Sequence, residues 1–150
     1  MKTYFIFLTG LLLNSFVQAQ TTPDPRLGQG YTYKVETGVV GKEVYISGQR
    51  PFNANGELVG AGDLSAQTQQ VFQNITAALG RVGMTMRDVK QVTYHLKGVP
   101  GLVNVATSQQ ASNVGAVFFG QAIPGIQEVK SLAQITRDDV LIEVEVIAIR

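Results

Sequence analysis

The stretch from Val44 to Val82 changes its apolar period partway along, and this change constrains the fold more than any other sequence feature. Up to Gly48, apolar and polar residues alternate, which is the period of a half-buried strand. After Asp63 the apolar residues recur at helical spacing on one face, namely Val71, Phe72, Ile75, Ala78, Leu79 and Val82. Asp63 can cap such a helix by accepting hydrogen bonds from free amides, and Gly83 can end it. The stretch therefore predicts a strand, a loop and a helix.

Four further segments have the composition of strands, and one has that of a second helix. The expected strands cover residues 31–39, 89–96, 126–135 and 140–149, and the expected helix covers residues 102–119. This order of elements predicts a single α+β layer with both helices on one face of a mixed sheet.

The last expected strand places two carboxylates among large apolar side chains. Its second face carries Leu141, Glu143, Glu145, Ile147 and Ile149. Burying a carboxylate without a partner is costly, so such a face is not an ordinary solvated surface. We expect this face to be covered and at least one glutamate to have a partner.

The first 19 residues have the pattern of a secretory signal peptide. Lys2 precedes an apolar run over residues 4–13, and small residues lead to a cleavage site near Ala19. The run is too short to span a bilayer, which argues against a membrane anchor. We expect an exported protein, periplasmic or secreted, with a flexible leader at 20–30 and one domain at 31–150.

The charge of the expected mature chain is balanced. The full chain has 12 basic and 11 acidic residues, and removal of residues 1–19 takes away only Lys2 among them. A nucleic-acid partner would favour a basic excess, so we expect none. With no cysteine in the sequence, stability has to come from the core and from oligomerisation.

Motifs for metals and nucleotide cofactors are absent from the sequence. His95 is the single histidine and cysteine is lacking, so we interpret His95 as structural and expect no metal site. No glycine-rich phosphate loop follows a strand, and we expect no cofactor. Ser47 and Gly48 end the Val44 strand, where a glycine lets a ligand approach, although an ordinary turn has the same pattern.

Six short motifs occur in order along nearly the whole expected mature chain. They are Ile46-Ser-Gly-Gln49, Gly56-Glu-Leu-Val-Gly60, Asp63-x-x-Ala-Gln-Thr68, Asp88-Val-x-x-Val-Thr93, Phe118-Phe-Gly120 and Leu141-Ile-Glu-Val-Glu-x-Ile-Ala148. Together they resemble the RidA family, formerly called YjgF. The resemblance implies a chorismate-mutase-like fold, a homotrimer and small-molecule pockets between subunits. It also implies hydrolysis of reactive 2-imino or 2-enamino acids to 2-keto acids and ammonia, without a metal or cofactor.

The resemblance assigns pocket roles to four positions of this chain. Ser47 and Gly48 match the Ser-Gly of the family pocket, and Tyr33 matches its tyrosine if one inserted residue is allowed. Glu143 matches its glutamate, which positions the attacking water. A structural hydrogen bond between subunits is an equally good interpretation of Glu143.

The sequence departs from the family at the arginine that anchors the substrate carboxylate. Residues 120–129 contain no arginine. Counting back from Glu143 puts Gln127 at this place, and counting forward from Phe118 puts Val129 there. Neither side chain can bind a carboxylate ionically, and Lys130 would point to the face opposite Val129.

Two interpretations of function follow. In the first, the chain is an exported RidA-like protein that binds a small molecule between subunits and lacks the archetypal deaminase activity. In the second, it is an imine or enamine hydrolase in which Arg50 replaces the lost anchor. Arg50 equally fits a solvated loop residue.

Overall fold

The computed structural model describes residues 33–37 and 42–150, with the backbone alone described for residues 33–37 and 42. The expected signal peptide and leader lie outside the described residues. The elements are β1 (Tyr33–Thr37), β2 (Lys42–Gln49), α1 (Leu64–Arg81), the 3₁₀ turn η1 (Met86–Asp88), β3 (Val89–Lys97), α2 (Val105–Phe119), β4 (Ile126–Leu132) and β5 (Ile142–Ile149).

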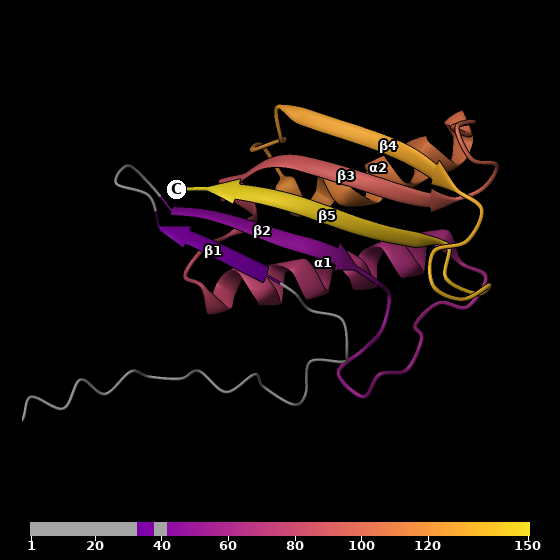
Figure 1. The fold of residues 1–150 in the computed structure, drawn as a ribbon, viewed down its shortest axis with the longest axis horizontal. Coiled ribbons are helices and arrows are strands. Elements are labelled where there is room, and N and C mark those ends of the chain that lie inside the picture. Colours follow the sequence, from indigo (N-terminus) through magenta and orange to yellow (C-terminus); the bar gives the residue numbers. More distant parts are fainter. Residues whose placement is uncertain (1–32, 38–41) are drawn as a thin grey trace, which may run out of the picture.

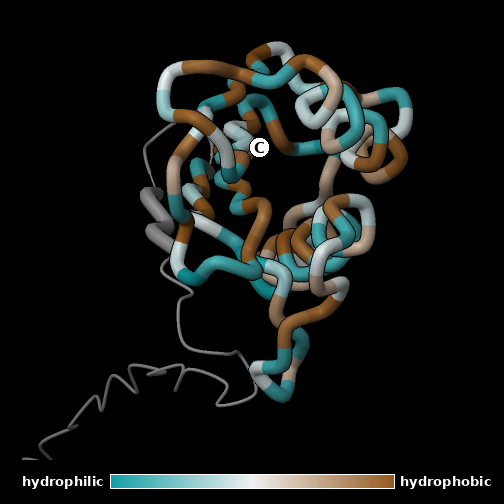
Figure 2. The backbone as a smooth tube through the Cα atoms, turned by 90° about the vertical axis from the view of Figure 1, so that its right-hand side faces the viewer, coloured by the Kyte–Doolittle hydropathy of each residue, from teal (hydrophilic) through white to brown (hydrophobic). Residues whose placement is uncertain are grey.

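The described strands form one five-stranded sheet in the order β1-β2-β5-β3-β4, with both helices on one side of it (Figure 1). All neighbouring strands are antiparallel except β3 and β4, which are parallel because α2 provides the crossover between them. Figure 2 shows the strands as one layer and the helices as the other. The α+β class, the mixed sheet and the placement of both helices on one face are therefore confirmed.

Several expected boundaries were wrong by a few residues. The expected helix at 102–119 begins only at Val105, because the Asn104 side chain accepts hydrogen bonds from Ala106 N at 3.0 Å and Thr107 N at 3.2 Å. The expected strand at 126–135 ends at Leu132, and the last strand begins at Ile142. Residues 133–141 form the loop between them. The predicted Asp63 cap of α1 is confirmed by bonds from Ser65 N and Ala66 N.

An aromatic cluster fills the space between α1, α2 and β3. Phe72 of α1 has ring-centroid distances of 6.0 Å to Tyr94, 5.3 Å to Phe118 and 5.4 Å to Phe119. A Cβ atom at Gly115 of α2 would lie 2.5 Å from the Tyr94 hydroxyl oxygen and 2.9 Å from the Phe72 ring. Glycine at this position therefore lets α2 approach the sheet closely. Burial raises the pKa of the Tyr94 hydroxyl to about 12.

The other face of the sheet is not covered by any element that the structure describes. On β5 it carries Glu143, Glu145, Ile147 and Ile149, as the alternation predicted, while the intervening residues are buried under the helices. The placement of Leu141 on this face was wrong, because Leu141 precedes the strand and packs against the core. Tyr45 is 38% exposed and Ile149 is 43% exposed on this face. We call it the open face. Among the described helices, none has the length and apolarity required to cross a membrane.

Candidate functional site

Gly48 and Glu143 lie against each other on the open face. Ser47 and Gly48 fall where the pairing of β2 with β5 shifts register between Ile46 and Gln49. A Cβ atom on Gly48 would lie 2.3 Å from the Glu143 carboxyl carbon and 2.4 Å from one of its oxygens. Only a glycine therefore lets the carboxylate lie over the backbone of β2 without moving. The structure brings together two of the residues that the family resemblance assigned to a pocket.

Arg50 completes this arrangement. Its Nε atom donates a hydrogen bond of 2.6 Å to Oε2 of Glu143, and the side chains are 35% and 14% exposed, respectively. Asn74 of α1 fixes the loop that carries Arg50, because its amide donates to the carbonyl oxygens of Arg50 and Phe52, both at 3.0 Å. The interpretation of Arg50 as a merely solvated loop residue is therefore wrong. We call Gly48, Arg50 and Glu143 the carboxylate clamp.

His95 and Glu145 lie directly beside the clamp. The strand pairing sets His95 of β3 opposite Glu143 of β5, with Glu145 two residues further along β5. His95 Nε2 lies 3.6 Å from Glu145 Oε1, and these side chains are 13% and 28% exposed. One ligand atom from each of His95, Glu143 and Glu145 lies within 4.8 Å of the other two.

Tyr45 of β2 borders the same carboxylates. Burial raises the pKa of its hydroxyl, and the negative charge of Glu145, a hydrogen bond with Glu145 and the charge of Glu143 raise it further. The neutral hydroxyl is therefore favoured and acts as a donor toward Glu145. No pattern in the sequence pointed to this role of Tyr45 or to the association of His95 with the two glutamates.

Tyr33 and Gln127 are not part of the clamp. Tyr33 lies in β1, where its Cα pairs with that of Ile46, and only its backbone is described. Gln127 lies on edge strand β4 opposite Val92, which is buried under the helices, so Gln127 is on the face away from Glu143. Lys130 pairs with His95 and is on the open face, as expected. Roles for Tyr33 and Gln127 remain predictions that require a second subunit.

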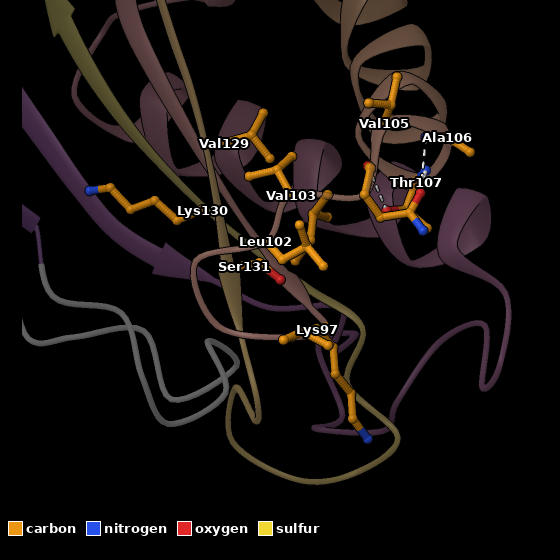
Figure 3. A pocket seen from close by; sticks show the side chains of 13 residues that line it. Lys97, Leu102, Val103, Val105, Ala106, Thr107, Val129, Lys130 and Ser131 are labelled. Carbon is orange, nitrogen blue, oxygen red and sulfur yellow. Dashed lines mark hydrogen bonds between the residues drawn. The ribbon is translucent and has the colours of Figure 1, made fainter.

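A separate cavity of about 500 Å³ opens on the helix side of β3 and β4 (Figure 3). Its walls are mainly apolar and come from both strands and from the loop leading into α2, with Leu96, Leu102, Val103, Val105 and Val129 among the lining residues. The Lys97 ammonium extends away and donates to the carbonyl oxygen of Asp138 at 2.6 Å. The clamp residues do not line this cavity, although Val129, one of the two places counted for the family arginine, does.

Comparison with known proteins agrees with the motifs and the fold. The family model described as Endoribonuclease L-PSP matches residues 25–150. The chain belongs to this family, which is the RidA/YjgF family. Its relatives include a RutC family protein from Pyrococcus horikoshii, which is 37% identical over 111 residues that cover 72% of this chain and 79% of the relative. A putative regulator named AldR from Lactococcus lactis is 34% identical over 76% of this chain and 84% of its own length.

Solved structures give the same architecture. A putative endoribonuclease from Thermotoga maritima has a TM-score of 0.67 at 28% identity and covers 85% of this chain and 94% of its own. RidA from an Antarctic Psychrobacter also has a TM-score of 0.67, at 24% identity, and covers 86% and 98% of the two chains. The second similarity concerns the fold alone. Family membership and the RidA-like fold are therefore established for this chain.

Proposed function

We propose that this RidA family protein binds a small molecule in a cleft between subunits, with the carboxylate clamp as part of the cleft wall, and lacks the archetypal deaminase activity. The main support for this proposal is the close approach of Gly48 to Glu143. This approach places the Glu143 carboxylate at the surface of the sheet, and the hydrogen bond from Arg50 fixes its position there. The family resemblance also supports the proposal, because the pockets of the family use a Ser-Gly pair and a glutamate. Export is part of the proposal and rests on the pattern of residues 1–19.

A homotrimer would supply the second wall of this cleft. The open face combines Tyr45, Ile147 and Ile149 with the clamp, whereas both helices pack on the opposite side. An apolar sheet face that its own chain leaves uncovered is a common site of subunit association.

We expect the mature protein to be a trimer in solution at micromolar concentration. Light scattering coupled to size-exclusion chromatography measures the mass directly. Replacement of Ile147 by Asp on the open face should weaken the association, while replacement of exposed Val117 on α2 by Asp should leave it unchanged. A monodisperse monomer of the unaltered protein would contradict the trimer and the cleft that depends on it.

Arg50 favours a second candidate, an imine or enamine hydrolase. Only its Nε atom donates to Glu143, and its two terminal nitrogens make no hydrogen bond with residues that the structure describes. Those nitrogens can hold a substrate carboxylate through a bidentate pair, which is the role of the missing family arginine. Glu143 would then position a water molecule that adds to the C=N carbon. Loss of ammonia from the resulting adduct gives the 2-keto acid.

We expect hydrolysis of 2-iminobutanoate by the unaltered protein to be at least about a hundredfold slower than by a relative with the family arginine. Two missing charge-assisted hydrogen bonds, each contributing roughly 1.5–3 kcal/mol, account for this difference. The assay generates the imine with an amino-acid dehydratase and follows its decay with and without the protein.

Comparable turnover would overturn the first proposal and support the second. In that case Arg50→Gln and Glu143→Gln should each remove the activity. Arg87→Gln, a change of an exposed arginine on η1, should have no effect. Activity that survives Arg50→Gln would show that Arg50 is not the substitute anchor.

A further inference from the structure

The open face holds a cluster whose donor atoms are typical of a transition-metal site. His95, Glu143 and Glu145 come from two adjacent strands, and their ligand atoms converge within 4.8 Å. All three side chains are less than one-third exposed. Strands held in register by cross-strand hydrogen bonds give these side chains a rigid base, which a loop would not provide.

The imidazole of His95 has no hydrogen-bond partner within the described part of the chain. Both of its ring nitrogens are buried, and the 3.6 Å separation from Glu145 is too long for a hydrogen bond. Buried polar atoms without partners are rare in folded proteins. The ring therefore has an unused nitrogen directed at a carboxylate, in a place where a cation would satisfy both.

The separation of the donors fits a zinc ion. Zinc binds imidazole nitrogen and carboxylate oxygen at about 2.0–2.2 Å, so two ligands in tetrahedral geometry lie about 3.4 Å apart. The His95–Glu145 separation of 3.6 Å is close to this value. A carboxylate oxygen of Glu143 lies within 4.8 Å of both ligand atoms.

Each carboxylate also has an outer partner of the kind that orients metal ligands. Arg50 Nε donates to Oε2 of Glu143, which leaves the other oxygen of that carboxylate to ligate. Tyr45 forms a hydrogen bond with Glu145. The two carboxylates outnumber the one guanidinium beside them, and this excess of acidic groups attracts a cation.

We propose that His95, Glu143 and Glu145 form a binding site for a divalent transition metal of the zinc type on the open face. One imidazole and two carboxylates leave a fourth tetrahedral position for water or another ligand. The site shares Glu143 with the proposed small-molecule cleft but is a separate proposal. It can be tested separately, because metal binding is measured without any organic ligand or enzymatic turnover.

The single histidine makes the test specific. The sequence has one histidine and no cysteine, so imidazole-dependent zinc binding by the tag-free mature protein has to involve His95. The protein is treated with a chelator, dialysed against micromolar Zn²⁺, and its zinc content is measured by elemental analysis. We expect one zinc per chain, whereas Mg²⁺ at the same concentration should not bind. A Co²⁺-loaded sample should show visible absorption bands that are lost when zinc is added.

Variants distinguish this site from adventitious binding. His95→Gln and Glu145→Gln should each weaken zinc binding by roughly a hundredfold, and Tyr45→Phe by roughly tenfold. Glu128→Gln is the matched control, because Glu128 is also on the open face but pairs with Lys130 on β4. It should bind zinc like the unaltered protein. Thermal melts of the metal-free variants establish that each is folded.

Three results would overturn the proposal. They are absence of zinc after dialysis, equal zinc affinity in a folded His95→Gln variant, and an equal loss of affinity in Glu128→Gln. None of these results would contradict a trimer or a small-molecule cleft, whose tests use mass and imine decay.

Discussion

Phe72→Ala is expected to lower the free energy of unfolding by about 3–5 kcal/mol, the range for truncating a buried aromatic side chain. Phe72 is fully buried and contacts three other rings from β3 and α2. Its removal therefore leaves a cavity at the meeting point of both helices and the sheet. Domains of this size have a total stability of about 5–15 kcal/mol, so the variant would lose a large part of it.

Urea unfolding followed by circular dichroism at a fixed protein concentration measures this change. A fixed concentration is needed because oligomers gain apparent stability by mass action. Val117→Ala is the control, since Val117 is 80% exposed on α2 and should change stability by no more than about 0.5 kcal/mol. A loss below about 1 kcal/mol in Phe72→Ala would show that the aromatic cluster is not the centre of the core.

Gln67→Leu is expected to cost about 2–4 kcal/mol, although it replaces a polar side chain by an apolar one of similar size. The Gln67 amide is fully buried and makes three hydrogen bonds to backbone groups. Its nitrogen donates to Gly60 O at 3.1 Å and Asp139 O at 2.7 Å, and its oxygen accepts from Leu141 N at 2.8 Å. Leucine would leave these backbone groups without their partner. Leaving a buried polar group unpaired lowers the stability by about 1–3 kcal/mol.

The Gln67 amide also holds the chain just before β5, the strand that carries Glu143 and Glu145. Loosening this connection should raise hydrogen exchange of the Leu141 amide, which nuclear magnetic resonance can follow beside the unfolding curve. Gln69→Leu on the same helix is the matched control, because Gln69 is exposed and should change stability by about 0.5 kcal/mol or less. Equal stability of the two variants would show that the buried Gln67 amide makes no net contribution to the free energy of unfolding.

Glu143 belongs to both the clamp and the proposed metal site. One oxygen accepts from Arg50, and the other is available to a ligand, a water molecule or a metal ion. The structure thus adds a hydrogen bond within the subunit to the two interpretations of Glu143 from the sequence, while the expected hydrogen bond between subunits stays a prediction. The Arg50 pair supplies the partner that the apolar neighbours of Glu143 required.

Local patterns in the sequence determined the elements and the faces they bury. The helical spacing after Asp63 and the alternation from Ile142 to Ile149 each state which side chains meet the core, because one face of a helix or strand has to be buried. The motif order along the chain determined the family. The glycine at position 48 and the glutamate at position 143 were found in this way, because the family resemblance assigns both residues to the same pocket.

Only the tertiary structure decided which distant residues meet. Strand order and register set His95 opposite Glu143 and put Gln127 on the other face, and neither follows from local periodicity. Arg50 and Glu143 are 93 residues apart in the sequence, so no spacing signal could pair them. The sequence led to the interpretation of His95 as structural, because its potential co-ligands are carboxylates on a neighbouring strand. A sequence pattern specifies the surface each element offers, whereas the free energy of packing the whole chain selects which surfaces come together.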